Sequence, residues 1–311
     1  MTAQYLLGRC AGLVMVLGVV SILAFLLMHA VPGGPFDETR APLPPAAKAN
    51  ILHKYALDKP LWVQYGSYVW HALHGDFGIP FQSPTETVLG LIIRVWPVTL
   101  LLGGIVVTLS FTCGLGLGIL SALRHNTWID NLLTALSTLG MTVPNFIIAI
   151  WLIVIVSVRL RWLPTGGWGE ARLLILPAIA YSLQPLAIVA RYTRVAVLDA
   201  RAGDYVRTAL AKGLSPSRVV MHHVLRNALI PIVTLLGPLI PDLFTGSIFI
   251  EVTFRIPGLG KFFVSSIFQR DYPMIMATVL LVAVLWSLTY LLSDLLYAVI
   301  DPRVRVGARG R

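Results

Sequence analysis

The feature that most constrains this sequence is a series of apolar runs, each long enough for a helix to cross a membrane. A helix needs about 20 apolar residues to span a hydrocarbon core of about 30 Å. The chain of 311 residues contains six such runs, which are Ala11–Val31, Pro97–Leu120, Leu132–Val158, Leu173–Ala190, Leu229–Ile250 and Pro273–Ile300. Charged residues make up 12% of the chain, against about 25% in soluble proteins. The sequence therefore predicts an all-α membrane protein with six transmembrane helices.

The first run follows Arg9 in the way that the apolar region of a signal peptide follows its basic start. Its 21 residues exceed the about 7–15 of a cleaved apolar region, so we expect it to remain as a membrane anchor. Several later runs contain proline, which frees a backbone carbonyl that must find a partner inside protein or water. We therefore expect kinked or broken helices near Pro144, Pro177, Pro185, Pro231, Pro238 and Pro241.

The basic residues gather on one side of the predicted spans. Because the number of spans is even, both termini lie on the same side as the loop between the fourth and fifth spans. That side collects 13 of the 24 basic residues, seven of them in this one loop. The positive-inside rule therefore places both termini and this loop in the cytoplasm. It also explains the net charge of +10 without a nucleic-acid partner.

The external segment Pro32–Trp96 contains two predicted amphipathic helices. The first covers Ala46–Tyr55, and the second is expected to begin with Asp58 as its N-cap and to end at Gly75. The second helix is dense in aromatic side chains, namely Trp62, Tyr65, Tyr68 and Trp70. These residues fit an aromatic belt at the membrane interface, or alternatively a docking surface for an external partner.

The basic loop at residues 191–228 carries the signals of two short helices in series. Asp204 can cap the start of the first helix and Gly213 its end. Ser215 and Pro216 then provide an N-cap and a first-turn proline for a second helix through Ala228. The pattern predicts a rigid, protruding knob suited to docking a protein, rather than a basic loop that only sets the orientation.

This loop resembles the EAA loop of peptide-permease subunits in binding-protein-dependent ABC importers, through Asp204–Leu214 and Leu225–Pro231. The resemblance extends over nearly the whole chain, in stretches that occur in the family's order: Ala30–Phe36, Leu57–Leu61, Gly75–Gly78, Trp162–Pro164, Ile256–Gly260, Arg270–Pro273 and Asp294–Pro302. The chain is identified as a member of this OppB/DppB-type family, and it is most similar to the first membrane subunit of the oligopeptide permeases.

The resemblance implies the type I ABC-importer membrane fold (MetI-like) and a division of the chain into three parts. Residues 1–95 form the first span and the external segment, residues 96–301 form the transmembrane domain with its coupling loop 191–228, and residues 302–311 form a basic cytoplasmic tail. The implied function is import of oligopeptides or dipeptides across the inner membrane of a bacterium. A permease for nickel or another small solute is the alternative within the family.

The resemblance also implies that this chain is not an enzyme and works with partners. These are a second, different permease chain, two cytoplasmic ATPase subunits that bind ATP and Mg²⁺, and an extracytoplasmic peptide-binding protein. The coupling loop docks on an ATPase and switches the spans between outward- and inward-facing states. Ala209 and Gly213 match the family's consensus, while Arg207 and Thr208 replace its glutamate and first alanine. The candidate coupling residues are Asp204, Arg207, Thr208, Ala209, Lys212 and Gly213.

Two acidic residues, Asp242 and Asp294, lie well inside predicted spans. A charge at a helix centre costs about 2.5–3.5 kcal/mol on insertion scales, so each should face protein or water. We interpret Asp242, beside Pro241, as a candidate for lining the translocation path, and Asp294 as a structural acid. A proton-coupled secondary transporter is the alternative of another class, but it would require paired intramembrane acids and an internal repeat.

Nucleotide and metal sites are not expected in this chain. Gly258–Lys261 is followed by Phe262, where a Walker loop needs Ser or Thr. The histidines occur in pairs without carboxylate or thiol residues at ligand spacing, so no metal site is predicted. These pairs are His71 with His74 and His222 with His223.

Overall fold

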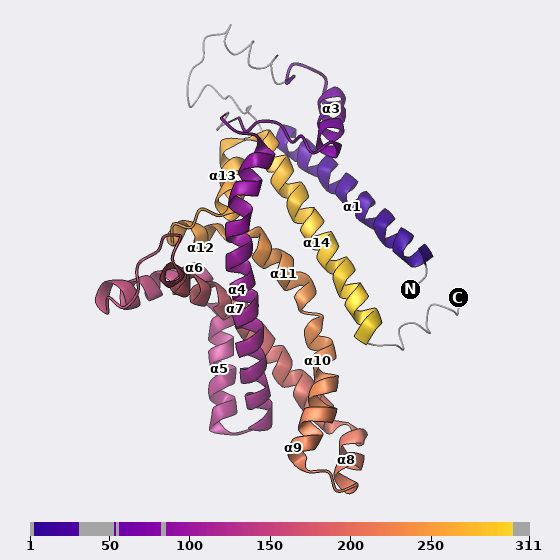
Figure 1. The fold of residues 1–311 in the computed structure, drawn as a ribbon, viewed down its shortest axis with the longest axis vertical. Coiled ribbons are helices and arrows are strands. Elements are labelled where there is room, and N and C mark those ends of the chain that lie inside the picture. The colour runs from indigo at the N-terminus through magenta and orange to yellow at the C-terminus, as the bar shows by residue number, and fades with distance from the viewer. Residues whose placement is uncertain (1–2, 31–52, 54–55, 82–84, 301–311) are drawn as a thin grey trace. The chain divides into compact units, whose positions relative to one another are not determined.

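The computed structural model describes residues 3–30, 53, 56–81 and 85–300, and this part consists of helices joined by loops (Figure 1). Four helices contain candidate membrane spans: α1 (Ala3–Ala30), α4 (Val88–Leu123), α7 (Ala171–Ala202) and α14 (Tyr272–Ile300). Two bent helix pairs bring the number up to six if each pair is one span. Counted in this way, the described residues contain the six predicted spans.

The first bent pair joins α5 (Trp128–Thr142) to α6 (Asn145–Leu152) and the π-helical segment η1 (Ile153–Arg159). The axis of the second half is bent by 104° from that of the first. The bend falls where it was predicted, because a proline disfavours the helical conformation in the residue before it and Val143, before Pro144, is extended with φ −80° and ψ 121°. At Pro177 and Pro185 the helix is not broken, since both prolines lie inside the continuous helix α7.

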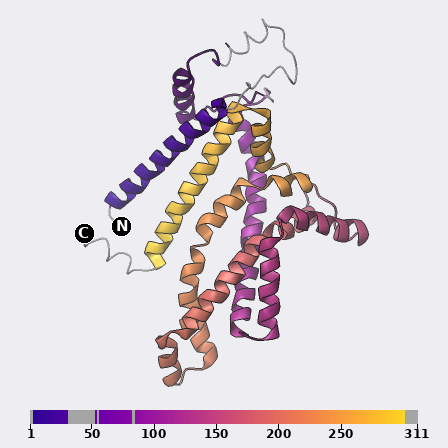
Figure 2. The same cartoon turned by 180° about the vertical axis from the view of Figure 1, so that it is seen from behind.

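The second pair bends by 51° between residues Pro216–Val233 and Gly237–Thr253. Its elements are α9 (Pro216–Val219), the π-helical turn η2 (Val220–Val224), α10 (Leu225–Val233), α11 (Leu236–Thr245) and α12 (Ile248–Thr253). Before it comes the short helix α8 (Asp204–Ala211). In both views of the ribbon, α8 and α9 lie together at the end of α7 and α10 (Figures 1 and 2).

The chain groups into two compact units, and the first combines residues 98–257 with those from 288 onward. Its largest core lies among α4, α6, α7, α11 and α12, with Leu102, Val106, Ala149, Tyr181, Leu243, Ile250 and Phe254 buried together. Glycines on α4 bring it against α7, since a Cβ on Gly118 would lie 2.5 Å from the carbonyl oxygen of Ala190. Small residues allow helix backbones to approach this closely.

The second unit combines residues 2–97 with 258–287. Its core is formed by the start of α4, by α13 (Leu259–Gln269) and by the start of α14, with Val88, Leu91, Val95, Leu259, Met274 and Ala277 buried. The helix α3 (Leu61–Leu73) begins after Pro60, so the prediction of Asp58 as its N-cap was wrong. The predicted end at Gly75 is confirmed by its positive φ of 79°.

Three predictions lie outside the described residues. They are the helix Ala46–Tyr55, the basic tail 302–311, and the surroundings of the Asp294 side chain, of which only the helical backbone in α14 is described.

Candidate functional site

The candidate coupling loop starts with α8, which begins directly after Gly203. Gly203 is the extended N-cap residue, and a Cβ at this position would lie 2.4 Å from the ring of Tyr205. Asp204 is consequently the first helical residue and not the cap, so that prediction was wrong. A carboxylate in the first turn still interacts favourably with the helix dipole.

Gly213 ends α8 in the left-handed conformation, with φ +82°, as the sequence predicts. Its N–H donates to the carbonyl of Leu210 at 2.9 Å, and the next N–H donates to the carbonyl of Ala209 at 3.3 Å. Pro216 occupies the first turn of α9 after the N-cap residue Ser215. The second helix does not stop at the predicted Ala228, because η2 and α10 continue it to Val233 and into the fifth span.

The inner face of the α8–α9 hairpin is buried against the ends of α4 and α7. This hairpin cluster consists of Ala122, Val197, Val206, Ala209, Val219, Val224 and Ala228. Arg201 on α7 adds a hydrogen bond from Nη1 to the carbonyl of Ala122, at 3.0 Å. The hairpin is therefore packed as one body with the ends of α4 and α7, and Ala209 serves in this packing and not on the surface.

The outer face of the hairpin carries exposed cations beside exposed apolar side chains. Arg207 and Lys212 are exposed, Leu210 on α8 is 45% exposed, and Met221 on the adjoining η2 is 60% exposed. The ion pair between Arg207 and Asp204, at 3.8 Å, joins two highly exposed side chains and contributes little to stability. Apolar side chains exposed together on a protruding element are typical of a protein-docking surface.

A buried ion-pair network, which the sequence analysis missed, ties α5 to α7. Asp130 in the first turn of α5 is 1% exposed. It accepts hydrogen bonds from Arg194 Nε at 2.7 Å and Nη2 at 2.8 Å, from the Ser121 hydroxyl at 2.5 Å and from the Asn126 N–H at 2.9 Å. His125 Nδ1 lies 3.1 Å from the same carboxylate. Four groups thus satisfy one buried charge, as burial requires.

The sequence carried one signal for this network. Asp130 lies two residues before the third apolar run. Asp242 and Asp294, in contrast, were selected as candidates because they lie inside runs. A carboxylate at the edge of a run is ordinarily assigned to the interface. Its partner Arg194 is 64 residues away in the sequence, and only the packing of α5 against α7 reveals the pair.

The predicted path residue Asp242 lies on α11, next to Pro241, and its side chain is exposed. Its backbone carbonyl accepts hydrogen bonds from the Tyr181 hydroxyl at 3.5 Å and from Thr245 Oγ1 at 3.0 Å. A second carboxylate, Glu251, is 1% exposed and accepts from Thr99 Oγ1 at 2.9 Å. Glu251 directly follows the last residue of the fifth apolar run, a position from which its burial was not predicted.

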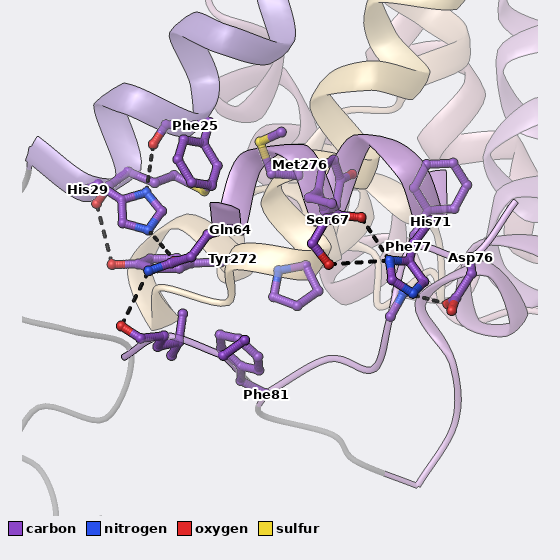
Figure 3. Close-up of a pocket in the computed structure, with 16 residues that line it drawn as sticks. Phe25, His29, Gln64, Ser67, His71, Asp76, Phe77, Phe81, Tyr272 and Met276 are labelled. Carbon is purple, nitrogen blue, oxygen red and sulfur yellow. Dashed lines mark hydrogen bonds between the residues drawn. The ribbon is translucent and has the colours of Figure 1, made fainter. Parts of the chain in front are cut away.

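The second unit has a pocket of about 350 Å³ among α1, α3, the segment after α3 and the start of α14 (Figure 3). His29 and Gln64 approach each other across it, with Nε2 and Oε1 3.3 Å apart. The hydroxyl of Tyr68 is buried there without a hydrogen-bond partner among the described residues, and burial raises the pKa of Tyr68. Trp62 and Trp70 are 77% and 64% exposed, so α3 offers an aromatic surface in addition to its packed side.

The sequence matches the family described as binding-protein-dependent transport system inner membrane component over residues 114–306. Its N-terminal companion family matches residues 2–103. The chain belongs to this family. The α8–α9 hairpin, the Asp130 network and Asp242 all lie within the first match. The predicted family and the multi-pass location in the inner membrane are thereby confirmed.

Relatives match nearly the whole chain. It is 39% identical to the dipeptide transport system permease protein DppB of Bacillus subtilis (strain 168) over 308 residues, 99% of this chain and 100% of the relative. It is 37% identical to the oligopeptide transport system permease protein OppB of Salmonella typhimurium (strain LT2), over 97% of this chain and 99% of the relative.

Among solved structures, the chain resembles an inward-facing conformation of the MetNI methionine ABC transporter. The TM-score is 0.57 at 20% sequence identity, over 68% of this chain and 97% of that chain. At this identity the likeness concerns the fold, and it confirms the predicted all-α membrane fold of an ABC-importer permease.

Proposed function

We propose that this chain is a permease subunit of an ATP-driven ABC importer that carries dipeptides or oligopeptides across the cytoplasmic membrane. The observation that carries the proposal is the match, over nearly the full length, to permease proteins named for dipeptide and oligopeptide transport. As the membrane component of such a system, the chain forms the path, and ATP hydrolysis belongs to separate subunits.

The α8–α9 hairpin is the proposed contact with a cytoplasmic ATPase, which holds ATP and Mg²⁺. Asp204, Arg207, Thr208 and Lys212 present polar groups on the exposed side, and Leu210 contributes apolar area. The concentration of basic residues in this loop supports a cytoplasmic position for the hairpin and for both termini. Closure of two ATPase subunits on ATP would then move the hairpin as a rigid body and bias the spans toward one of two states.

A second permease chain and an extracytoplasmic peptide-binding protein complete the proposed assembly. The exposed Asp242 supports a second chain, because a carboxylate facing lipid in a span would cost about 2.5–3.5 kcal/mol. Facing a path enclosed with that second chain, Asp242 would meet water and the amino terminus of a peptide. On the external side, the exposed aromatic surface of α3 is available to the binding protein.

Copurification tests the assembly. The tagged chain, purified in mild detergent, should bring an ATPase and a second permease, and a peptide-loaded binding protein should stimulate hydrolysis. Recovery of the chain alone, with solute flux in the absence of ATP, would exclude an ABC importer.

Gly213→Pro tests the hairpin separately. Proline fixes φ near about −65°, which conflicts with the φ of +82° at this position, and it also removes the N–H that bonds Leu210. The variant should insert into the membrane normally and lose the ATPase. Gly213→Ala keeps the N–H and should therefore lose less of the ATPase than Gly213→Pro does. Gly66→Pro would break α3 and cannot serve as the control.

Asp242→Asn tests the path. Uptake of peptides with a free amino terminus should fall relative to amino-acetylated peptides if the carboxylate meets that group. Equal uptake of both classes by the variant and the parent protein would remove Asp242 from the path.

A further inference from the structure

A small polar cavity lies in the first unit, apart from the coupling hairpin and from Asp242. It has a volume of about 230 Å³ and lies among α4, α5 and α7. Its wall carries the side chains of Arg191 and Arg194 from α7, and those of Thr134 and Ser137 from α5. Ser121 and Thr138 also line the cavity, together with apolar and small residues such as Leu117 and Gly118.

Several polar groups of this wall are hydrogen-bond donors without a partner among the described residues, whereas Ser121 donates to Asp130 and Thr138 donates to the Thr134 carbonyl. Arg194 uses Nε and Nη2 on Asp130, and Nη1 makes no hydrogen bond within the described residues. Over the same residues, Arg191 has neither a hydrogen bond nor an ion pair, and the hydroxyls of Thr134 and Ser137 are not hydrogen-bonded. Asp130 balances the charge of Arg194, so the guanidinium of Arg191 leaves the cavity with a net positive charge.

This combination selects an anion with several acceptor oxygens. Guanidinium groups bind phosphate and carboxylate through strong, charge-assisted hydrogen bonds. Hydroxyls add donors without adding charge. A tetrahedral phosphate can accept from donors on two helices at once, which suits a cavity with guanidinium groups on α7 and hydroxyls on α5.

The position of Arg191 along α7 indicates which kind of molecule supplies such a phosphate. At a rise of 1.5 Å per residue, the 32 residues of α7 extend about 48 Å, longer than the hydrocarbon core of about 30 Å. Arg172 marks one end of the helix, and Arg191 follows about 30 Å farther along, at the opposite edge of the core. Lipid phosphates lie at this depth, and exposed Leu136, on the same helix as Ser137, gives acyl chains an apolar surface.

We propose that this cavity binds the phosphate group of an anionic phospholipid of the cytoplasmic leaflet. Basic pockets between transmembrane helices on the cytoplasmic side bind such headgroups. The assignment of the leaflet rests on the proposed orientation of the chain, whereas the phosphate site rests on the donors alone. A bound lipid would bridge α5 and α7 beside the Asp130–Arg194 pair, and so strengthen the connection between these helices.

Native mass spectrometry of the intact complex, purified with its partner subunits and delipidated, tests the proposal. The probes are phosphatidylglycerol, phosphatidylcholine and inorganic phosphate, added separately. Arg191→Gln removes the unbalanced charge, and Ser137→Leu fills the cavity without touching either arginine. Arg172→Gln, at the other end of the same helix, is the matched control.

The parent complex and Arg172→Gln should retain phosphatidylglycerol in preference to phosphatidylcholine. Arg191→Gln and Ser137→Leu should each weaken retention about tenfold, as expected from the loss of one charge-assisted contact. Equal retention by all four proteins would overturn the site. Occupancy by inorganic phosphate with no lipid retained would overturn the lipid source.

The readout is independent of transport, so it separates this site from the proposed function. A complex that binds the lipid through Arg191 but imports no peptide would refute the function and leave the site in place. Labelling of single cysteines placed at residues 126 and 170 from either side of the membrane decides the leaflet. Labelling of residue 126 from outside would overturn the assignment to the cytoplasmic leaflet.

Discussion

Removal of the Asp130 carboxylate should destabilise the protein more than any exposed acidic substitution. In Asp130→Ala, Arg194 keeps its charge but loses two hydrogen bonds at 2.7 and 2.8 Å. Ser121 and the Asn126 N–H lose their acceptor as well. Breaking a buried ion pair costs about 3–5 kcal/mol. Because the Arg194 side chain is 24% exposed and regains some water, we expect a loss of about 3 kcal/mol in the free energy of unfolding.

A double-mutant cycle measures how much of this loss belongs to the pair. The proteins are Asp130→Ala, Arg194→Ala and the double variant, unfolded by denaturant in detergent and followed by circular dichroism. The double variant leaves no unpaired charge at the site, so it should be more stable than the sum of the two single losses predicts. We expect a coupling energy of about 2 kcal/mol, within the range for residues in one network.

The matched control is Asp199→Ala, an exposed acid on the same helix as Arg194. Surface substitutions of this kind change stability by about 0.5 kcal/mol or less. Losses at Asp130 and Arg194 that add within about 0.5 kcal/mol would show that the two sites are independent. That result would refute the argument that this pair connects α5 to α7.

Three further changes follow from the same structure. Gly118→Leu should abolish folding or assembly, since its Cβ would lie 2.5 Å from backbone and side-chain atoms of α7, whereas Gly116→Leu, with open space around it, should express normally. Western blots of membrane fractions measure both. Thr99→Val should lower the thermal midpoint, because buried Glu251 loses a hydrogen bond at 2.9 Å worth about 1.5–3 kcal/mol, and recovery by Thr99→Ser would attribute the loss to the hydroxyl. Arg207→Ala should leave the thermal midpoint unchanged, since its ion pair is exposed, yet reduce ATPase copurification; normal copurification would remove it from the docking surface.

The apolar runs predict the spans well because membrane insertion depends on local composition. The run Leu173–Ala190, for example, lies inside α7, although α7 continues to Ala202. The extension carries Arg191, Arg194 and Arg201, and hydropathy ends a run where such charges begin. Helical hydrogen bonding does not end there, so α7 continues past the apolar run and leads directly to the α8–α9 hairpin.

The hairpin itself was predicted from glycine and proline chemistry, which is local. Gly213 ends α8 as expected because only glycine takes a φ of +82° without strain. Asp204 was misplaced by one residue, because Gly203 takes the extended N-cap conformation and Asp204 is already helical. The Asp130–Arg194 pair could not be predicted, because it depends on which faces of α5 and α7 meet.

These contacts connect the short hairpin to several spans. The hairpin cluster joins α8, α9 and η2 to Ala122 at the end of α4 and to Val197 on α7. One turn of helix before Val197, Arg194 binds Asp130 and so attaches α5. A push on the exposed side of α8 therefore meets a packed apolar cluster and a buried ion pair, neither of which deforms gradually. The ends of α4, α5 and α7 should consequently move with the hairpin as one body, and we expect the bend of 51° between α10 and α11 to absorb that motion along the fifth span.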